Sequence, residues 1–212
     1  VNPKDILTRL TAAQSGLSGH QLVMNHRYKV GYYKYQRDSV ADTIIGKTYI
    51  PVTSFIWNFD YKINSHKFIN ESGTQGKDFF PNTYLNAAGT NEFNRYWHLR
   101  NTLGISLLEG FNKWAKAGLK IFATSELRHF SLPAPTMGTD SYNEHNLGIG
   151  AQMNKTQGSF RFNATAEATL TGTDAGQLKL NGQTDLRLPL LGDTLRIDAK
   201  AGMERLVPTF YY

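Results

Sequence analysis

Six histidines are the side chains of this sequence best suited to metal or proton chemistry, and their spacing does not favour a metal site. They stand at His20, His26, His66, His98, His129 and His145. No two of them form a His-x-x-x-His pair or another zinc spacing. A single histidine within a strand is more commonly a hydrogen-bonded structural residue. Cysteine is absent, which excludes thiolate zinc sites, disulfides and thiol nucleophiles. We therefore expect no metal ligand and no cofactor.

Carboxylates could supply a general acid and base, but the sequence does not pair them. The candidates are Asp60, Glu109, Glu126 and Glu167, and nothing in one sequence sets the separation that glycoside hydrolysis requires. There is no Gly-x-Ser-x-Gly elbow and no Walker loop. Gly148-Ile149-Gly150 is an isolated Gly-x-Gly inside a strand pattern, where close packing of strands explains it better than a nucleotide. We predict no catalytic residue and no enzyme.

The charge pattern indicates a solvated polar surface rather than a nucleic-acid interface. The formal net charge is +6, but Lys and Arg are spread along the chain and interleaved with Asp and Glu instead of forming one basic stripe. Hydrophobic residues make up 40% of the chain, charged residues 19% and aromatic residues 12%. This composition is too apolar for a disordered chain, and its richness in glycine and aromatic residues is typical of β-barrels.

Eight segments alternate between apolar and polar residues with a period of two, which predicts β-strands with two different faces. Several are longer than the roughly 5–6 residues of an average strand, and they match the roughly 9–11 residues that cross a membrane. The segments are approximately 22–35, 52–64, 96–108, 114–128, 146–154, 159–170, 177–190 and 194–206.

Short and long connections alternate between these segments. Residues 109–112, 155–158 and 191–193 read as tight turns, whereas residues 65–95 and 129–145 read as long loops. Outer-membrane barrels have short periplasmic turns and longer outside loops. Residues 1–21 show no convincing strand period, so we expect an irregular leader segment followed by barrel strands over residues 22–212.

Each predicted strand has an apolar and a polar face, and the two faces would meet different surroundings. Alternation alone does not distinguish a sheet against lipid from a sheet against a second sheet, so a soluble β-sandwich that binds glycans remains an alternative. In a barrel, the lipid-facing residues would be Leu22, Phe55, Leu103, Ile121, Phe162, Leu186 and Ile197. The lumen-facing residues that line the pore would be Arg27, Lys29, Asp60, Lys120, Arg161, Arg187 and Arg196.

Several segments resemble the putative porin family of Bacteroidetes outer membranes. They are Leu22–Tyr28, Tyr49–Ser54, Asn101–Lys116, Asp174–Leu178 and Leu186–Thr194, and they follow one another through nearly the whole chain. The resemblance implies an outer-membrane barrel with a presumed pore function. Because members of that family are much longer, it also implies that these residues are an internal fragment, with an export signal upstream.

We therefore predict an all-β, antiparallel up-and-down transmembrane β-barrel in the bacterial outer membrane, of which about eight strands are seen here. The expected function is porin-like passage of small solutes, tuned by the charges of the lumen. The expected contacts are membrane lipid, lipopolysaccharide and small solutes, without nucleic acid. A homo-oligomer, or association with another outer-membrane protein, stays open. An alternative is a structural or interaction barrel that does not conduct, with the 65–95 loop as its binding surface or plug.

Overall fold

The fold is all-β in the part of the chain that the computed structural model describes, which is residues 12–37, 44–71, 89–108, 117–134, 138–190 and 192–208. No helix in these ranges is long and apolar enough to cross a membrane. The strands are β1 (Ala13–Arg37), β2 (Ile44–Asn70), β3 (Thr90–Leu107), β4 (Gly118–Pro133), β5 (Thr139–Lys155), β6 (Phe160–Thr171), β7 (Leu178–Leu190) and β8 (Asp193–Arg205).

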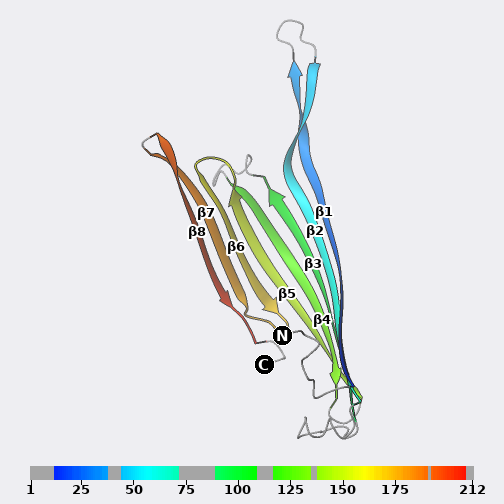
Figure 1. The fold of residues 1–212 in the computed structure, drawn as a ribbon. Helices are drawn as coiled ribbons and strands as arrows, with labels where there is room; N and C mark the ends of the chain where they lie inside the picture. The colour runs from blue at the N-terminus through cyan, green and yellow to red at the C-terminus, as the bar shows by residue number, and fades with distance from the viewer. Residues whose placement is uncertain are drawn as a thin grey trace. The chain divides into compact units, whose positions relative to one another are not determined.

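All eight strands belong to one sheet, and each pairs with the next strand along the chain. The order is β1-β2-β3-β4-β5-β6-β7-β8 (Figure 1). Strands β5 to β8 pair antiparallel in every case, as expected when tight turns join successive strands. This up-and-down order confirms the predicted fold class.

The pairing register keeps like residues together across neighbouring strands. Phe160 lies opposite Leu186, which lies opposite Ile197, whereas Arg161 lies opposite Asp185, which lies opposite Asp198. Because side chains alternate between the two faces of a strand, this register collects apolar residues on one face of β6–β8 and polar residues on the other. We call these the apolar face and the polar face.

Several strands extend further than the apolar alternation predicts. β1 begins at Ala13 rather than near Leu22, β2 continues to Asn70, and β4 continues to Pro133. The segments expected as long loops, 65–95 and 129–145, are therefore partly strand. Backbone hydrogen bonds can extend a hairpin even where the strands have no apolar face. Such extensions show no apolar–polar alternation in the sequence. Residues 1–11 and the tight turn expected at 109–112 lie outside the described residues.

On the central strands, the apolar side chains are exposed and the polar ones are covered, which is the reverse of the pattern in a soluble sheet. Leu103, Ile121 and Ile149 are 61%, 56% and 52% exposed, whereas the alternate residues on the other side are half-buried or buried from Gly118 to Arg128 on β4 and from Asn146 to Asn154 on β5. The buried hydrophobic residues found in the described ranges are Ile56, Ala117, Phe130 and Ala134. The strands described here are therefore not held in place by a buried apolar core like that of a soluble protein.

Phe122 is an aromatic residue between Lys120 and Thr124 on one side of β4, and two glycines make room for it. A Cβ at Gly150 would lie 2.3 Å from Phe122 Cζ, and a Cβ at Gly104 would lie 3.1 Å from Phe122 Cβ. Gly104 and Gly150 stand on the strands that flank β4. The isolated Gly-x-Gly of β5 thus serves close packing, as its place in a strand predicts.

Residue contacts divide the chain into two units. One comprises Val1–Leu22, Asp60–Leu99 and Leu127–Glu144; in it Trp97 stacks on His129 with ring centroids 5.6 Å apart, and Arg128 Nε lies 3.0 Å from Glu144 Oε2. The other comprises Val23–Phe59, Arg100–Glu126 and His145–Tyr212. It holds both polar clusters described below.

Candidate functional site

The polar face of β6, β7 and β8 carries a dense set of charged and amide side chains. From the register, its members are Arg161, Asn163, Thr165, Glu167, Lys179, Asn181, Gln183, Asp185, Arg187, Arg196, Asp198, Lys200 and Glu204. Both signs of charge are interleaved, so no large region has a single sign. A surface of this kind is expected to stay in contact with water.

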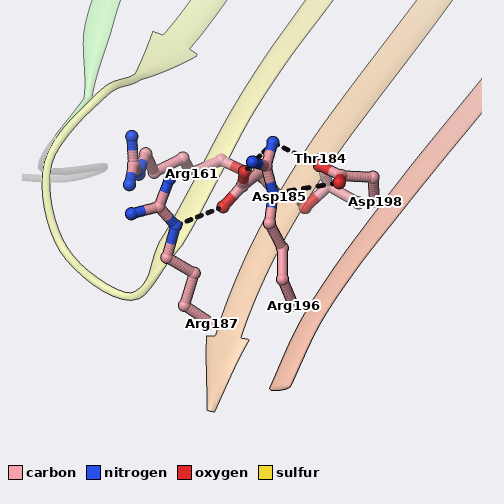
Figure 2. Close-up of polar contacts among 6 residues, drawn as sticks. All are labelled: Arg161, Thr184, Asp185, Arg187, Arg196 and Asp198. Atoms are coloured by element: carbon pink, nitrogen blue, oxygen red, sulfur yellow. Dashed lines mark hydrogen bonds and ion pairs between the residues drawn. The ribbon is translucent and has the colours of Figure 1, made fainter. Parts of the chain in front are cut away.

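Three arginines from three strands lie together with two aspartates on this face (Figure 2), and two of the arginines pair with the aspartates. Arg196 Nη2 lies 2.7 Å from Asp185 Oδ2, and Arg187 Nε lies 3.2 Å from Asp185 Oδ1. Arg196 Nε also lies 3.0 Å from Asp198 Oδ2. In Figure 2, Arg161 lies beside Asp185 and Arg187. We call these five residues the arginine cluster.

The register explains why the cluster forms. Arg187 lies directly opposite Arg196, and Asp185 lies directly opposite Asp198. Like charges placed directly opposite destabilise a strand pair, but the two pairs are adjacent on one face, so each arginine reaches a carboxylate along or across the strands. The sequence has Asp-x-Arg on β7 and Arg-x-Asp on β8. Antiparallel pairing therefore brings these four charged side chains into one compact group.

The cluster is accessible and carries a surplus of positive charge. The side chains of Arg196 and Arg187 are 56% and 41% exposed. Three guanidinium groups face two carboxylates, which leaves one net positive charge. Exposed ion pairs contribute only about 0–1 kcal/mol each to stability.

A second polar cluster lies on the same side of β3, β4 and β6. Arg100 Nη2 lies 3.4 Å from Glu167 Oε2, and the hydroxyl oxygens of Thr102 and Thr124 are 3.5 Å apart. Lys120 Nζ lies 4.9 Å from the centroid of the Phe122 ring, within the range of a cation–π contact. Polar contacts therefore continue across this side of the sheet beyond the arginine cluster.

The structure brings together three of the seven residues predicted to line a lumen. Arg161, Arg187 and Arg196 share the arginine cluster, whereas Lys120 stands on β4 beside Phe122. Arg27 and Lys29 stand on β1, and Asp60 stands on β2, where its Oδ1 accepts a hydrogen bond of 2.8 Å from Gln21 Nε2. These three residues take no part in the arginine cluster.

Of the seven residues predicted to face lipid, five are exposed, and Phe162 and Leu186 are half-buried. Phe162 lies opposite Thr184, two positions from the Phe160–Leu186 pair, so Phe162, Leu186 and Ile197 lie on one face. Leu22, Phe55, Leu103, Ile121 and Ile197 are all among the exposed large hydrophobic residues.

An aromatic group accompanies this apolar surface on β1 and β2. The His26 and Trp57 rings stack with centroids 5.3 Å apart, and Trp57 Nε1 donates to Asn101 Oδ1 over 3.3 Å. Trp57 thus pairs an apolar ring with a satisfied polar edge, as aromatic residues at a membrane interface do. Trp114 and Tyr211, which also stand near predicted strand ends, lie outside the described residues.

Sequence reasoning did not single out Asp185, Asp198 or Arg100 as site residues. Their alternation placed them on polar faces, but their partnership depends on which strand position lies opposite which. The sequence does contain a signal for the cluster: Asp-x-Arg before the turn at Gly192 is mirrored by Arg-x-Asp after it. A two-stranded hairpin places these two motifs opposite each other. Gly192 has φ of +87°, which suits a tight hairpin turn.

Among the residues that the structure describes, there is no group of three or more His, Cys, Asp or Glu side chains that could hold a metal ion. The histidines instead make polar or ring contacts, such as His129 Nδ1 at 2.7 Å from Asn143 Oδ1 and Ser15 Oγ at 2.9 Å from His66 Nε2.

Comparison with known proteins places this architecture in one family. The family model described as "Putative porin" matches residues 1–212, which is the whole chain. No curated protein and no solved structure matches the chain. Together with the single up-and-down sheet, the match confirms the resemblance seen in the sequence: the chain belongs to the putative porin family, whose members are porin-like outer-membrane β-barrels.

Proposed function

We propose that this chain forms part of the wall of an outer-membrane barrel through which small solutes pass along the polar face. The observation that carries the proposal is the pairing of an exposed apolar face with a charged face on one sheet. A barrel in lipid requires apolar residues outside and polar residues around its aqueous interior. The family match supports the same reading.

The energetic argument concerns the exposed apolar side chains. Each fully exposed Leu, Ile or Phe forgoes about 1.5–3 kcal/mol of hydrophobic stabilisation relative to burial. Leu103, Ile121 and Ile149 lie on neighbouring strands and are each more than half exposed, so water would leave a contiguous apolar surface uncovered. Lipid tails remove this cost because they are as apolar as the side chains that they cover.

The orientation of each face follows from this proposal. The apolar residues Leu22, Phe55, Leu103, Ile121, Phe162, Leu186 and Ile197 face lipid tails, and residues near the outer leaflet meet lipopolysaccharide. The charged residues Arg27, Lys29, Asp60, Lys120, Arg161, Arg187 and Arg196 face the water-filled lumen. Their fields act on solutes at short range, because water and salt screen charges over about 8–10 Å.

Planar-bilayer recording of the full-length protein tests passage directly. The expected result is stepwise conductance that is abolished when the same detergent preparation is unfolded before addition. Uptake of small solutes by vesicles containing the protein should rise in parallel. If correctly folded protein in the bilayer gave no conductance steps at any voltage, the chain would belong to a structural barrel that does not conduct.

A further inference from the structure

A small polar cavity lies on the polar side of the sheet, where the turn between β6 and β7 meets the strands beside it. Its volume is about 60 Å³, which is room for about two water-sized groups at roughly 30 Å³ each. The charged and amide residues that line it are Arg100, Glu126, Asn146, Glu167, Asp174, Gln177 and Lys179. None of them belongs to the arginine cluster.

The backbone around the cavity departs from regular pairing. The register between β5 and β6 shifts between Leu147 and Gly148, and the turn that follows β6 folds against Asn146. The Asp174 backbone N–H donates to Asn146 Oδ1 over 2.9 Å. Gly172 has φ of +101°, and a Cβ there would lie 2.4 Å from Asn146 Oδ1. The close approach of this turn therefore requires glycine.

One polar group at this cavity lacks a partner. Asn146 is only 4% exposed, and within the ranges that the structure describes its Nδ2 has no hydrogen-bond partner. Its Oδ1 is already held by the turn. A buried amide donor without an acceptor costs about 1–3 kcal/mol, so the cavity offers a binding position to an oxygen atom that can accept a hydrogen bond.

The charges around the cavity narrow the class of ligand. Two cationic residues, Arg100 and Lys179, stand against three carboxylates, Glu126, Glu167 and Asp174. The lining residues carry one more formal negative charge than positive charges, which disfavours a carboxylate or phosphate ligand, while the Asn146 amide donor disfavours a cation beside it. A hydroxyl group satisfies both conditions, because it accepts a hydrogen bond from an amide and donates one to a carboxylate.

We propose that this cavity is a subsite for the hydroxymethyl or hydroxyl group of a neutral polyhydroxylated solute, such as a sugar or polyol. A hydroxymethyl group has two heavy atoms and fits the available volume. Arg100 and Glu167, paired at 3.4 Å, offer further donors and acceptors to the hydroxyls that remain outside. This assignment rests on the proposed function, since it supposes that solutes reach the polar face.

Glucose binding to the full-length protein in detergent micelles, measured by isothermal titration calorimetry, tests the subsite independently of conductance. The key variant is Asn146→Asp, which keeps the Oδ1 acceptor for the Asp174 N–H and removes the Nδ2 donor. The matched control is Asn181→Asp, the same change at an exposed asparagine of the polar face outside this cavity. Acetate serves as the anionic comparison ligand.

We expect glucose to bind to the native protein, at least tenfold weaker binding to the Asn146→Asp variant, and little change for Asn181→Asp. Three results would overturn the subsite: no glucose binding up to about 100 mM, a concentration at which a binding free energy of only about −1.4 kcal/mol would half-saturate the site; equal loss in both variants; or tighter binding of acetate than of glucose. Conductance without glucose binding would reject the subsite and leave the proposed function standing. Glucose binding without conductance would support the subsite and reject the proposed function.

Discussion

Replacing Ile121 with Lys is expected to lower the free energy of unfolding of the bilayer-inserted protein by about 2–4 kcal/mol if this residue lies near the middle of the membrane. Ile121 is 56% exposed in the structure and stands between the apolar side chains of β3 and β5. In lipid, the substituted ammonium group loses its hydration. The measurement is a denaturant titration of the protein folded into phospholipid vesicles.

A polar-face substitution provides the control for this result. Gln183→Lys adds the same group to an exposed position of the polar face of β7, and it should change the unfolding free energy by less than about 0.5 kcal/mol. Comparing the unfolding free energies of the two variants shows whether the apolar face is in contact with lipid or with water. If Ile121→Lys were as mild as Gln183→Lys, the apolar face would be in contact with water.

Reversing one charge in the arginine cluster is expected to shift ion selectivity toward cations by about fivefold, the factor that corresponds to roughly 1 kcal/mol for charges 4 Å apart in water. Arg161→Glu changes the cluster from one net positive to one net negative charge. Among the interactions found in the described residues, the Arg161 side chain forms none of the cluster's ion pairs, although it lies opposite Asp185 in the register of β6 and β7. The reversal potential in a salt gradient reports the shift.

Lys155→Glu makes the same change in net charge of the protein on the opposite face. Lys155 lies opposite Phe162 in the register of β5 and β6, and Arg161 therefore points the other way from it. This control should move the reversal potential little. The shift from Arg161→Glu should also shrink as salt rises, because screening shortens the reach of the charge. Equal shifts from both variants would mean that Arg161 does not line the conducting path.

The fold class could be read from the sequence because one feature dominates it. Strict alternation, as in Leu178-Lys179-Leu180 on β7 or Ile197-Asp198-Ala199 on β8, has a period of two that a helix cannot accommodate. The resulting strands joined by tight turns left sequential antiparallel pairing as the simplest topology. The family match and the observed strand order agree with that prediction.

The strand ends and the site geometry could not be read in the same way. β1 begins at Ala13, and its first nine residues include a single large apolar side chain, Leu17, so that period two leaves no clear trace. Asn146 looked like the start of an ordinary strand, because the contact between its side chain and the Asp174 backbone depends on the path of a turn 28 residues further along the chain. Pairing register and turn path are tertiary properties, and a single sequence does not encode them as a local pattern.

Cysteine scanning of β8 (Asp193–Arg205) in outer-membrane vesicles tests the division between lipid and water most directly. The protein has no native cysteine, and every residue of this strand is exposed in the structure, so protein burial cannot cause differences in labelling. With a membrane-impermeant maleimide, we predict strong labelling at positions 196, 198 and 200 and weak labelling at positions 195, 197 and 199. Uniform labelling along the strand would contradict an apolar face covered by lipid.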